Sequence, residues 1–361
     1  KRQAVDLGEK PAVPSAIAKY HATEAGRRIV NDAMDVHGGK GAVLGPRNYL
    51  GRGYQGMPIW ITVEGANILT RNLIIFGQGA IRCHPFLFRE MESANQSDVA
   101  GFDDALLGHG SHIMSNFSRS LFHGLTRGRL LESPRHGPSG QYYRQFSRMS
   151  LAFAVTAEMT LLSLGGGLKR KESLSGRLGD VLSLLYLGSA VLKHHHDNGS
   201  PDDELPLLEW ACQDLLHGIQ TRLHEVLDNL PNRFVAGITR TLTFPTGKPY
   251  QRPSDELGQQ VANLILEPGS LRDRLTEAVY IPVNKSEAIA QLDDALEKSF
   301  AAEPAIRKLR SAMKAGSLPK GDPEEHIDAG VEARIITEHL SLIHISEPTR
   351  PNAPSRMPSS A

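Results

Sequence analysis

The sequence predicts an all-α protein. From Pro85 onward, apolar residues recur at the three- and four-residue spacing of amphipathic helices, and no run of alternating apolar and polar residues indicates a strand. Turn signals such as 198–201 and 267–269 separate the periodic segments. The clearest helix covers 204–230, where these apolar residues share one face: Leu205, Leu208, Cys212, Leu215, Ile219, Leu223, Val226 and Leu230.

Composition excludes several classes of protein. The 361 residues allow one large domain or two to three ordinary ones. The 40 basic and 40 acidic residues balance, so no overall field attracts nucleic acid, and we expect no nucleic-acid partner. The most apolar stretch, 151–164, is interrupted by polar residues and predicts no membrane span. The only two cysteines, Cys83 and Cys212, favour a reducing compartment and buried thiols.

Two helices are expected near the N-terminus. Ser15 is a suitable N-cap for a helix that runs to about residue 36, and Gly38-Gly39 ends it because glycine tolerates positive φ. A glycine-rich loop is expected over 40–58. The second helix is expected to begin near Glu64.

The remaining helices and the C-terminal tail follow from the same patterns. Residues 346–361 contain four prolines and no apolar periodicity, which predicts disorder, and the run from Ile343 to Pro351 resembles translated adapter sequence. We therefore interpret 341–361 as a disordered artefact. Helices are predicted over 102–129, 140–164, 172–196, 204–230, 254–266, 270–279, 286–314 and 323–341.

Glu64 is the most conspicuous candidate for chemistry. It is an acid within an apolar stretch, and Gly65 follows it directly. A glutamate among apolar groups has a raised pKa and becomes useful as a base, whereas a glutamate at a helix start that faces water is an ordinary partner of the helix dipole. The stretch alone favours the ordinary interpretation.

Three further motifs also have simple structural explanations. The loop 35–41 could approach a phosphate, but it lacks the P-loop and dinucleotide patterns, and a helix stop explains it better. The run 165–171 is explained by a helix C-cap followed by solvated basic residues. In 194–196, consecutive histidines on a helix point about 100° apart and cannot converge on one ion, so we expect an exposed, frayed helix end and no metal.

Taken together, two motifs resemble the end of the C-terminal helical domain of acyl-CoA dehydrogenases. The first is the loop Asp35-Val36-His37-Gly38-Gly39-Lys40-Gly41, and the second is Glu64-Gly65. The later part resembles the C-terminal extension of bacterial long-chain acyl-CoA dehydrogenases of fatty-acid β-oxidation, through 165–172, 231–237 and 272–276. The expected domains are thus 1–82, the end of the catalytic helical domain, and 83–340, the helical extension.

The resemblance implies an FAD enzyme that oxidises long-chain acyl-CoA to trans-2-enoyl-CoA. In that family the acid at the position of Glu64 removes the α-proton while the β-hydrogen leaves as hydride to flavin. Val63 and Gly65 would lie beside the substrate. By the same resemblance, the residues Asp35, Val36, His37, Gly38 and Gly39 would lie against the adenosine diphosphate part of FAD, in a contact that reaches the flavin of a neighbouring subunit. Asn67 is implied as a further cofactor contact.

Some residues depart from the family pattern. His37 and Val63 stand where many relatives carry aromatic residues, and Ala66 replaces a common threonine. The chain begins with Lys1, and the domains that hold the flavin ring in the family are not part of it, so we expect this chain alone to bind FAD weakly and to be inactive.

Two functions therefore remain open. The first is the C-terminal portion of an acyl-CoA dehydrogenase, with a homo-oligomer sharing the FAD site and an electron-transfer acceptor as further partners. The second is a non-catalytic helical scaffold or partner-binding module of the same fold, which the residues at Val63 and Ala66 favour. We expect a cytoplasmic location, with a peripheral position at the inner membrane as the alternative.

Overall fold

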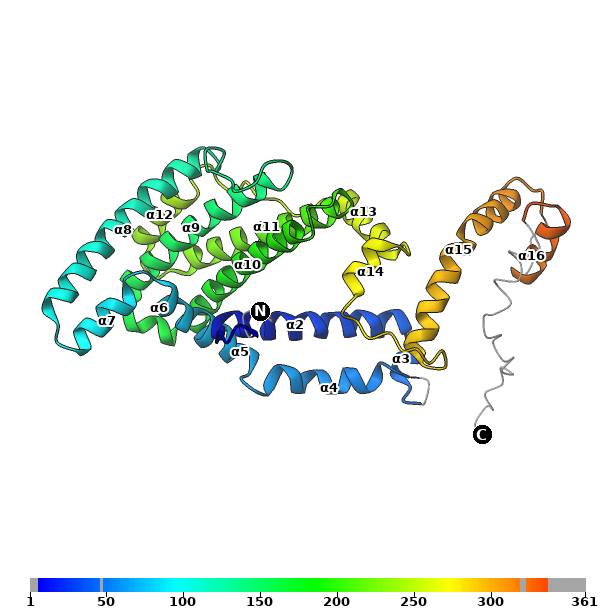
Figure 1. The fold of residues 1–361 in the computed structure, drawn as a ribbon, viewed down its shortest axis with the longest axis horizontal. Coiled ribbons are helices and arrows are strands. Elements are labelled where there is room, and N and C mark those ends of the chain that lie inside the picture. The colour runs from blue at the N-terminus through cyan, green and yellow to red at the C-terminus, as the bar shows by residue number, and fades with distance from the viewer. Residues whose placement is uncertain (1–5, 46–47, 319–322, 337–361) are drawn as a thin grey trace, which may run out of the picture. The chain divides into compact units, whose positions relative to one another are not determined.

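The computed structural model describes residues 6–45, 48–318 and 323–336. Within these ranges the chain is built of α-helices with one π-helix, short 3-10 turns and no strand, which confirms the all-α prediction (Figure 1). Contacts divide it into two compact units, 1–262 and 263–361. The predicted tail 341–361 lies outside the described residues.

The N-terminal segment holds α2, whose ends differ from prediction only at the start. The helix begins at Ala12 rather than at a Ser15 cap, and the Ser15 amide donates to Pro11 O at 2.9 Å inside the first turn. Prolines are tolerated there because first-turn N–H groups have no helical partner. At the other end Gly38 has φ of 53°, so the predicted glycine stop is confirmed. Helix α2 covers Ala12–His37 and α3 covers Gly39–Ala42.

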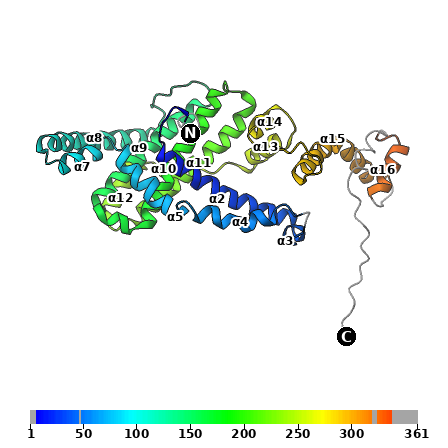
Figure 2. The same ribbon diagram turned by 60° about the horizontal axis from the view of Figure 1, so that its bottom comes forward.

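A further helix, α4, replaces much of the loop predicted over 40–58. It covers Gly51–Thr62 with Pro58 inside it. The side chain of Asn48 accepts hydrogen bonds from Leu50 N at 3.0 Å and Gly51 N at 2.8 Å, which satisfies amides at the helix start. Helix α4 runs beside α2 in both views (Figures 1 and 2), and Met57 packs against it. Packing along this face outweighs the weak helix propensity of the glycines.

Three short elements follow α4. They are α5 (Asn67–Leu69), the π-helix η1 (Thr70–Gln78) and α6 (Gly79–Cys83). The helix predicted to begin near Glu64 therefore starts three residues later, at Asn67, and Glu64 lies in the turn before it. Segments of π-helix are rare and occur often at functional sites.

The rest of the first unit is a helical bundle. Its core lies where α9, α10 and α11 meet, around Met149, Val181 and Ile219. Helices α7 and α12 were absent from the prediction, whereas the others agree closely with it. The elements are α7 (Leu87–Asn95), α8 (Val99–Leu125), α9 (Gly140–Leu164), η2 (Gly165–Arg170), α10 (Glu172–Asp197), η3 (Asp202–Glu204), α11 (Leu205–Asn229), α12 (Arg233–Thr243) and α13 (Asp255–Leu266).

By length and composition alone, the helical stretch Gly140–Arg170 could cross a membrane. Its residues instead contribute to the bundle core, and it contains the buried polar side chains of Arg148 and Glu158. Contacts with α8, α10, α11 and α12 surround α9. These features are those of the central helix of a bundle, which passes the same test of length and apolar content.

Helix α10 approaches η1 very closely. A Cβ added at Gly179 would lie 2.5 Å from the carbonyl oxygen of Arg71, and one at Gly176 would lie 2.5 Å from Asn72 Oδ1. The Arg71 guanidinium also makes two hydrogen bonds of 2.6 Å to the Asp180 carboxylate. Paired, parallel hydrogen bonds of this kind fix orientation. The π-helix that follows the Glu64 turn is therefore held directly by α10.

The second unit is smaller. It contains α14 (Ser270–Thr276), α15 (Ala288–Lys314) and α16 (Pro323–Glu332). A small core forms around Ala305, Leu309, Leu318 and Ile336. The last predicted helix, 323–341, ends earlier, at Glu332.

Candidate active site

Glu64 lies in a tight turn between α4 and α5. Its φ is 52° and that of Gly65 is 91°. Positive φ at a residue with a Cβ costs about 1 kcal/mol or more, and such strain persists only where the surroundings impose it. The Glu64 side chain is exposed and has no hydrogen-bond or ion-pair partner among the described residues. Its carboxylate is therefore presented to the outside of this chain, and the backbone of the turn sets the point from which the side chain extends.

The turn is anchored to α2 by the ammonium group of Lys19. Lys19 Nζ donates to Gly65 O at 2.9 Å and to Asn67 Oδ1 at 2.6 Å, and Ile61 O lies 3.5 Å away. The Gly65 carbonyl also accepts from Thr70 Oγ1 at 3.1 Å, so both of its lone pairs are used.

Asn67 is buried beneath the turn. Its side chain is 4% exposed, and its Nδ2 donates to Thr23 Oγ1 at 2.9 Å and to Glu24 Oε1 at 2.8 Å. Together with Lys19 Nζ, three side chains of α2 engage this amide. In this chain Asn67 therefore ties the turn to α2, and its predicted contact with FAD stays a prediction.

The predicted glycine loop lies at the other end of α2 and is helical in the structure except at Gly38, since Asp35–His37 end α2 and Gly39 begins α3. Asp35, Val36, Gly38 and Gly39 are exposed, and a Cβ added at either glycine would meet no atom within 4 Å. His37 is half-buried: its Nδ1 donates to Ala33 O at 2.8 Å, so its Nε2 accepts from the Tyr49 hydroxyl at 2.5 Å. The loop thus presents an open backbone surface that a ligand could approach closely.

Helix α4 separates the two predicted motifs. Its 12 residues span about 18 Å at 1.5 Å per residue. The glycine loop precedes it and the Glu64 turn follows it, while its Met57 packs against Gly26 of α2. Within one chain the structure therefore does not bring Asp35–Gly39 next to Glu64. Of the other predicted substrate residues, Val63 is exposed beside Glu64 and Gly65 is half-buried.

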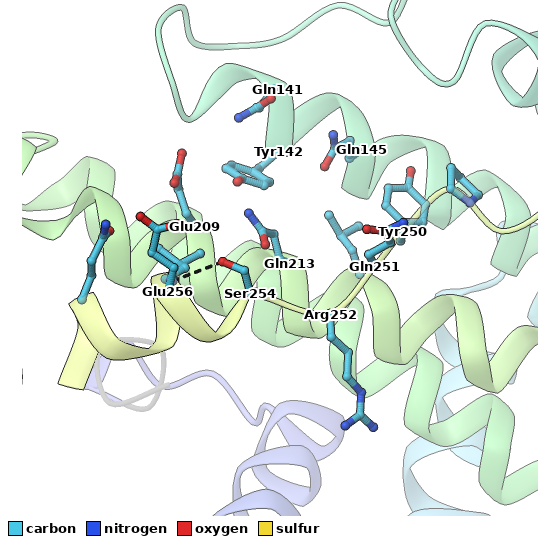
Figure 3. A pocket seen from close by; sticks show the side chains of 14 residues that line it. Gln141, Tyr142, Gln145, Glu209, Gln213, Tyr250, Gln251, Arg252, Ser254 and Glu256 are labelled. Carbon is cyan, nitrogen blue, oxygen red and sulfur yellow. Dashed lines mark hydrogen bonds between the residues drawn. The ribbon is translucent and has the colours of Figure 1, made fainter.

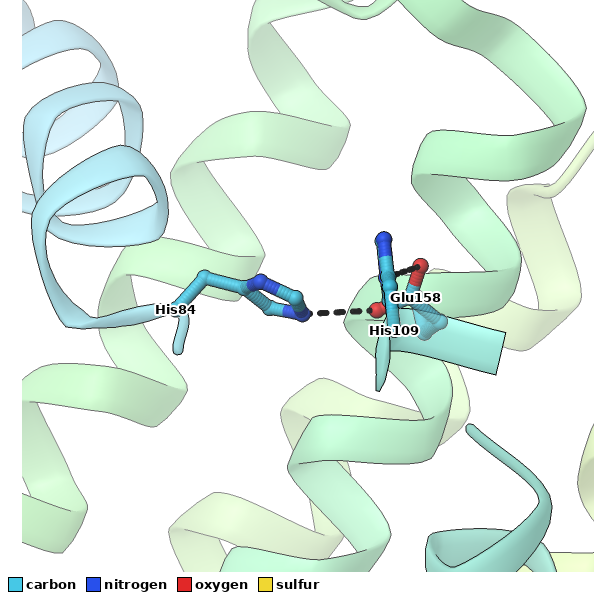
Figure 4. Close-up of side chains that lie close together, drawn as sticks. All are labelled: His84, His109 and Glu158. Atoms are coloured by element: carbon cyan, nitrogen blue, oxygen red, sulfur yellow. Dashed lines mark hydrogen bonds and ion pairs between the residues drawn. The ribbon is translucent and has the colours of Figure 1, made fainter. Parts of the chain in front are cut away.

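A second polar cluster joins His84, His109 and Glu158 (Figure 4). His84 Nε2 lies 3.2 Å from Glu158 Oε2, and His109 Nε2 lies 3.0 Å from Glu158 Oε1. His109 Nδ1 lies 2.7 Å from Glu90 Oε1. Burial opposes ionisation of Glu158, but the hydrogen bond from His84 and the charge of His109 outweigh it and hold the Glu158 pKa below its ordinary value.

Hydrogen bonds from the backbone decide how this cluster is protonated. His84 Nδ1 accepts from Phe86 N at 3.2 Å and Leu87 N at 3.0 Å, which are amides at the start of α7. The proton of a neutral His84 must then sit on Nε2, and a protonated nitrogen is not a metal ligand. Each nitrogen of His109 faces a carboxylate oxygen, that of Glu90 or that of Glu158. The observed geometry fits hydrogen bonds between these side chains better than a bound ion.

The described cavities include a polar groove in the extension (Figure 3). It has a volume of about 690 Å³ and lies between α9, α11 and the segment 249–260. Its lining is rich in glutamine amides and includes Tyr142 and Tyr250. No residue predicted from the sequence as part of a site lines it. The groove offers many hydrogen-bonding groups and no cluster that indicates a reaction.

The sequence prediction missed Lys19, Thr23 and Glu24. The helix pattern held no signal for Lys19, because it lies two positions after Ile17 and points to another side of the helix. A half-buried cation needs acceptors. Those acceptors are 42 to 48 positions away, where periodicity carries no information.

The prediction that the histidine run 194–196 is exposed was wrong at His195. This residue is 4% exposed, and its Nδ1 lies 3.6 Å from a Glu204 carboxylate oxygen.

Two family models agree with the resemblance found in the sequence. Residues 2–77 match the family model for the acyl-CoA dehydrogenase C-terminal domain. Among solved structures, the chain is similar to an acyl-CoA dehydrogenase from Bacillus anthracis, complexed with FAD, with 14% identity and a TM-score of 0.48. The match covers 69% of this chain and 38% of that one. Residues 81–343 match the model for the bacterial-type C-terminal part of acyl-CoA dehydrogenases. Because this match extends over most of the sequence, the chain belongs to the acyl-CoA dehydrogenase family.

Proposed function

We propose that this chain is part of an FAD-dependent acyl-CoA dehydrogenase that oxidises long-chain acyl-CoA to trans-2-enoyl-CoA in fatty-acid β-oxidation. The observation that carries the proposal is the Glu64 turn. It presents an unpartnered carboxylate at the position where this family has its base, on a backbone held from two sides. The long-chain preference rests on the resemblance of the extension alone.

Glu64 acts in this proposal as the base that takes the α-proton of the acyl thioester. FAD supplies the acceptor for the β-hydrogen, which leaves with its electron pair. The electrons of the broken α C–H bond form the new double bond, so the product is an enoyl thioester. A backbone N–H at the turn stabilises negative charge on the thioester oxygen, as in an oxyanion hole. Gly65 and Val63 lie beside the reacting carbons.

Asp35–Gly39 bind the adenosine diphosphate part of FAD in this proposal. Open space at Gly38 and Gly39 fits close backbone contact with a phosphate-bearing ligand. The length of α4, about 18 Å, supports separate roles for the two motifs. One chain would then supply its glutamate to one flavin and its glycine loop to the flavin of a neighbouring subunit, which requires a homo-oligomer. We place the protein in the cytoplasm, with an electron-transfer partner that reoxidises the flavin.

The direct test uses the longer protein that contains this chain. Purified protein is mixed anaerobically with acyl-CoA thioesters of increasing chain length, and the flavin absorbance is recorded. Bleaching that is fastest with long chains, with enoyl-CoA as the product, is the expected result. Bound flavin without bleaching by any acyl-CoA would reject the reaction. Absence of flavin from the longer protein would favour the non-catalytic scaffold.

A further inference from the structure

Lys19 connects α2 to the candidate base without touching it. Its ammonium group reaches three oxygen atoms that flank Glu64 in sequence: Ile61 O before the turn, and Gly65 O and Asn67 Oδ1 after it. Ammonium has three donors and no acceptor, so this set uses its full capacity. Hydrogen bonds from a charged donor are roughly twice as strong as neutral ones.

The acceptors of Lys19 are all uncharged. Its closest described contacts are two carbonyl groups and an amide oxygen, and the nearby Glu24 carboxylate accepts from Asn67 instead. A half-buried lysine more commonly pairs with a carboxylate. Here the charged ammonium group instead holds the backbone of one turn.

The turn needs such fixing. Two consecutive residues, Glu64 and Gly65, have positive φ, and the Glu64 side chain has no described partner that would orient it. The direction in which the Glu64 side chain leaves the backbone therefore depends on the peptide groups on either side. Lys19 and Thr70 hold the Gly65 carbonyl, and Asn67 links the same turn to Thr23.

We propose that Lys19 is a positioning residue for the catalytic base, acting through Gly65 and Asn67. This rests on the proposed role of Glu64. The lysine holds the strained turn in place, so that the Glu64 side chain starts from a fixed point beside the substrate. Misplacement of a reacting group by about 1 Å can cost about 100-fold in rate, so loss of this anchor should affect the chemical step.

The test measures flavin reduction by acyl-CoA in the longer protein, under anaerobic rapid mixing, for wild type, Lys19→Met and Lys19→Arg. We expect Lys19→Met to lower the limiting reduction rate at least about tenfold, with the apparent Kd for acyl-CoA within about twofold and flavin content unchanged. Lys19→Arg keeps a cation and should recover part of the rate. A matched control is Arg27→Met, which removes an exposed cation of the same helix that has no described partner.

Several results would overturn the proposal. They are a Lys19→Met rate within about twofold of wild type, an equal loss in Arg27→Met, or a weaker Kd with an unchanged limiting rate. If Lys19→Met fails to fold, Lys19→Gln tests the same contacts, because it removes the charge and the reach of the ammonium group while keeping a polar side chain. A wild-type rate in Lys19→Gln would then reject the proposal.

A parallel measurement on Glu64→Gln separates this proposal from the proposed function. If Glu64→Gln abolishes reduction while Lys19→Met does not slow it, only the inference about Lys19 fails. If Glu64→Gln reduces flavin normally, the base lies elsewhere and both proposals fail.

Discussion

At the scale of single residues, His224 makes the stability of the fold depend on pH. Its ring packs 4.4 Å from that of Phe244, its Nε2 is buried without a hydrogen bond, and the residue is 7% exposed. Burial, aided by the charges of Lys248 and Arg240, lowers the His224 pKa to about 4. Between the folded and unfolded pKa values, the unfolded chain therefore binds a proton at His224 that the folded chain does not bind. The stability that comes from keeping His224 neutral is fully present above the unfolded pKa of 6.5 and is lost as pH falls toward 4.

This assignment predicts that His224→Leu and His136→Leu differ in how their free energy of unfolding depends on pH. Between pH 7.5 and 5 the His224 contribution falls by about 2 kcal/mol, and His224→Leu should remove that part of the pH dependence. The free energy of unfolding in urea, measured at both pH values, gives the comparison. His136→Leu, which replaces an exposed histidine, should keep the wild-type dependence. Equal slopes in wild type and His224→Leu would contradict the account.

At the residue scale, the burial expected of Cys212 is confirmed at 0% exposure. The role of Glu64, which stood out in an apolar stretch of the sequence, stays a prediction. Burial also raises the pKa of the Cys212 thiol to about 12. Lys19 was missed because its role exists only once residues 61, 65 and 67 fold back onto α2. Such contacts follow from tertiary structure and leave no local pattern.

At the scale of elements, periodicity predicted long core helices well and failed where glycine is frequent. Helix α9 was predicted over 140–164 and occupies Gly140–Leu164, because its buried residues repeat at helical spacing. Helix α4 was assigned to a loop because of its glycines, yet packing on α2 and the amides bound by Asn48 stabilise it. Propensity is a weak indicator when tertiary contacts compensate for it.

The contact between α10 and η1 gives an element-scale prediction. Gly179→Ala would place a Cβ 2.5 Å from a backbone oxygen that cannot rotate away, so we expect a loss of about 1–3 kcal/mol in unfolding free energy. Gly237→Ala is the matched control, because it lies in α12 with no atom within 4 Å of the added Cβ. It should be neutral or stabilising by about 0.5–1 kcal/mol. Equal effects of the two substitutions in urea unfolding would show that helix propensity, rather than close packing, decides the outcome.

At the scale of the whole molecule, the order of weak motifs carried more information than any one of them. The family followed from the glycine loop, Glu64-Gly65 and the later motifs together, and the family models confirm it. The compact unit 1–262 crosses the predicted boundary after residue 82, because Arg71 and η1 pack directly on α10. The division into 1–82 and 83–340 therefore stays a prediction.

Flavin binding by the isolated chain is a prediction at the same scale. The exposed residues Asp35, Val36, Gly38 and Gly39 precede α4 in the chain and the exposed Glu64 follows it, and α4 itself is about 18 Å long. Neither offers an enclosed site within the described residues, so we expect this chain alone to retain no flavin on purification. Absorbance between 350 and 500 nm, about the range of oxidised flavin, after incubation with excess FAD and desalting gives the measurement. A stoichiometric flavin on the isolated chain would contradict the prediction.

The identity of the base is the central claim, and flavin reduction in Glu64→Gln tests it most directly. The longer protein is mixed anaerobically with a long-chain acyl-CoA, with wild type and Asp32→Asn, an exposed acid on α2, as controls. The account predicts rapid bleaching in both controls and none in Glu64→Gln, with equal flavin content in all three. Bleaching of Glu64→Gln at the wild-type rate would show that another group removes the α-proton.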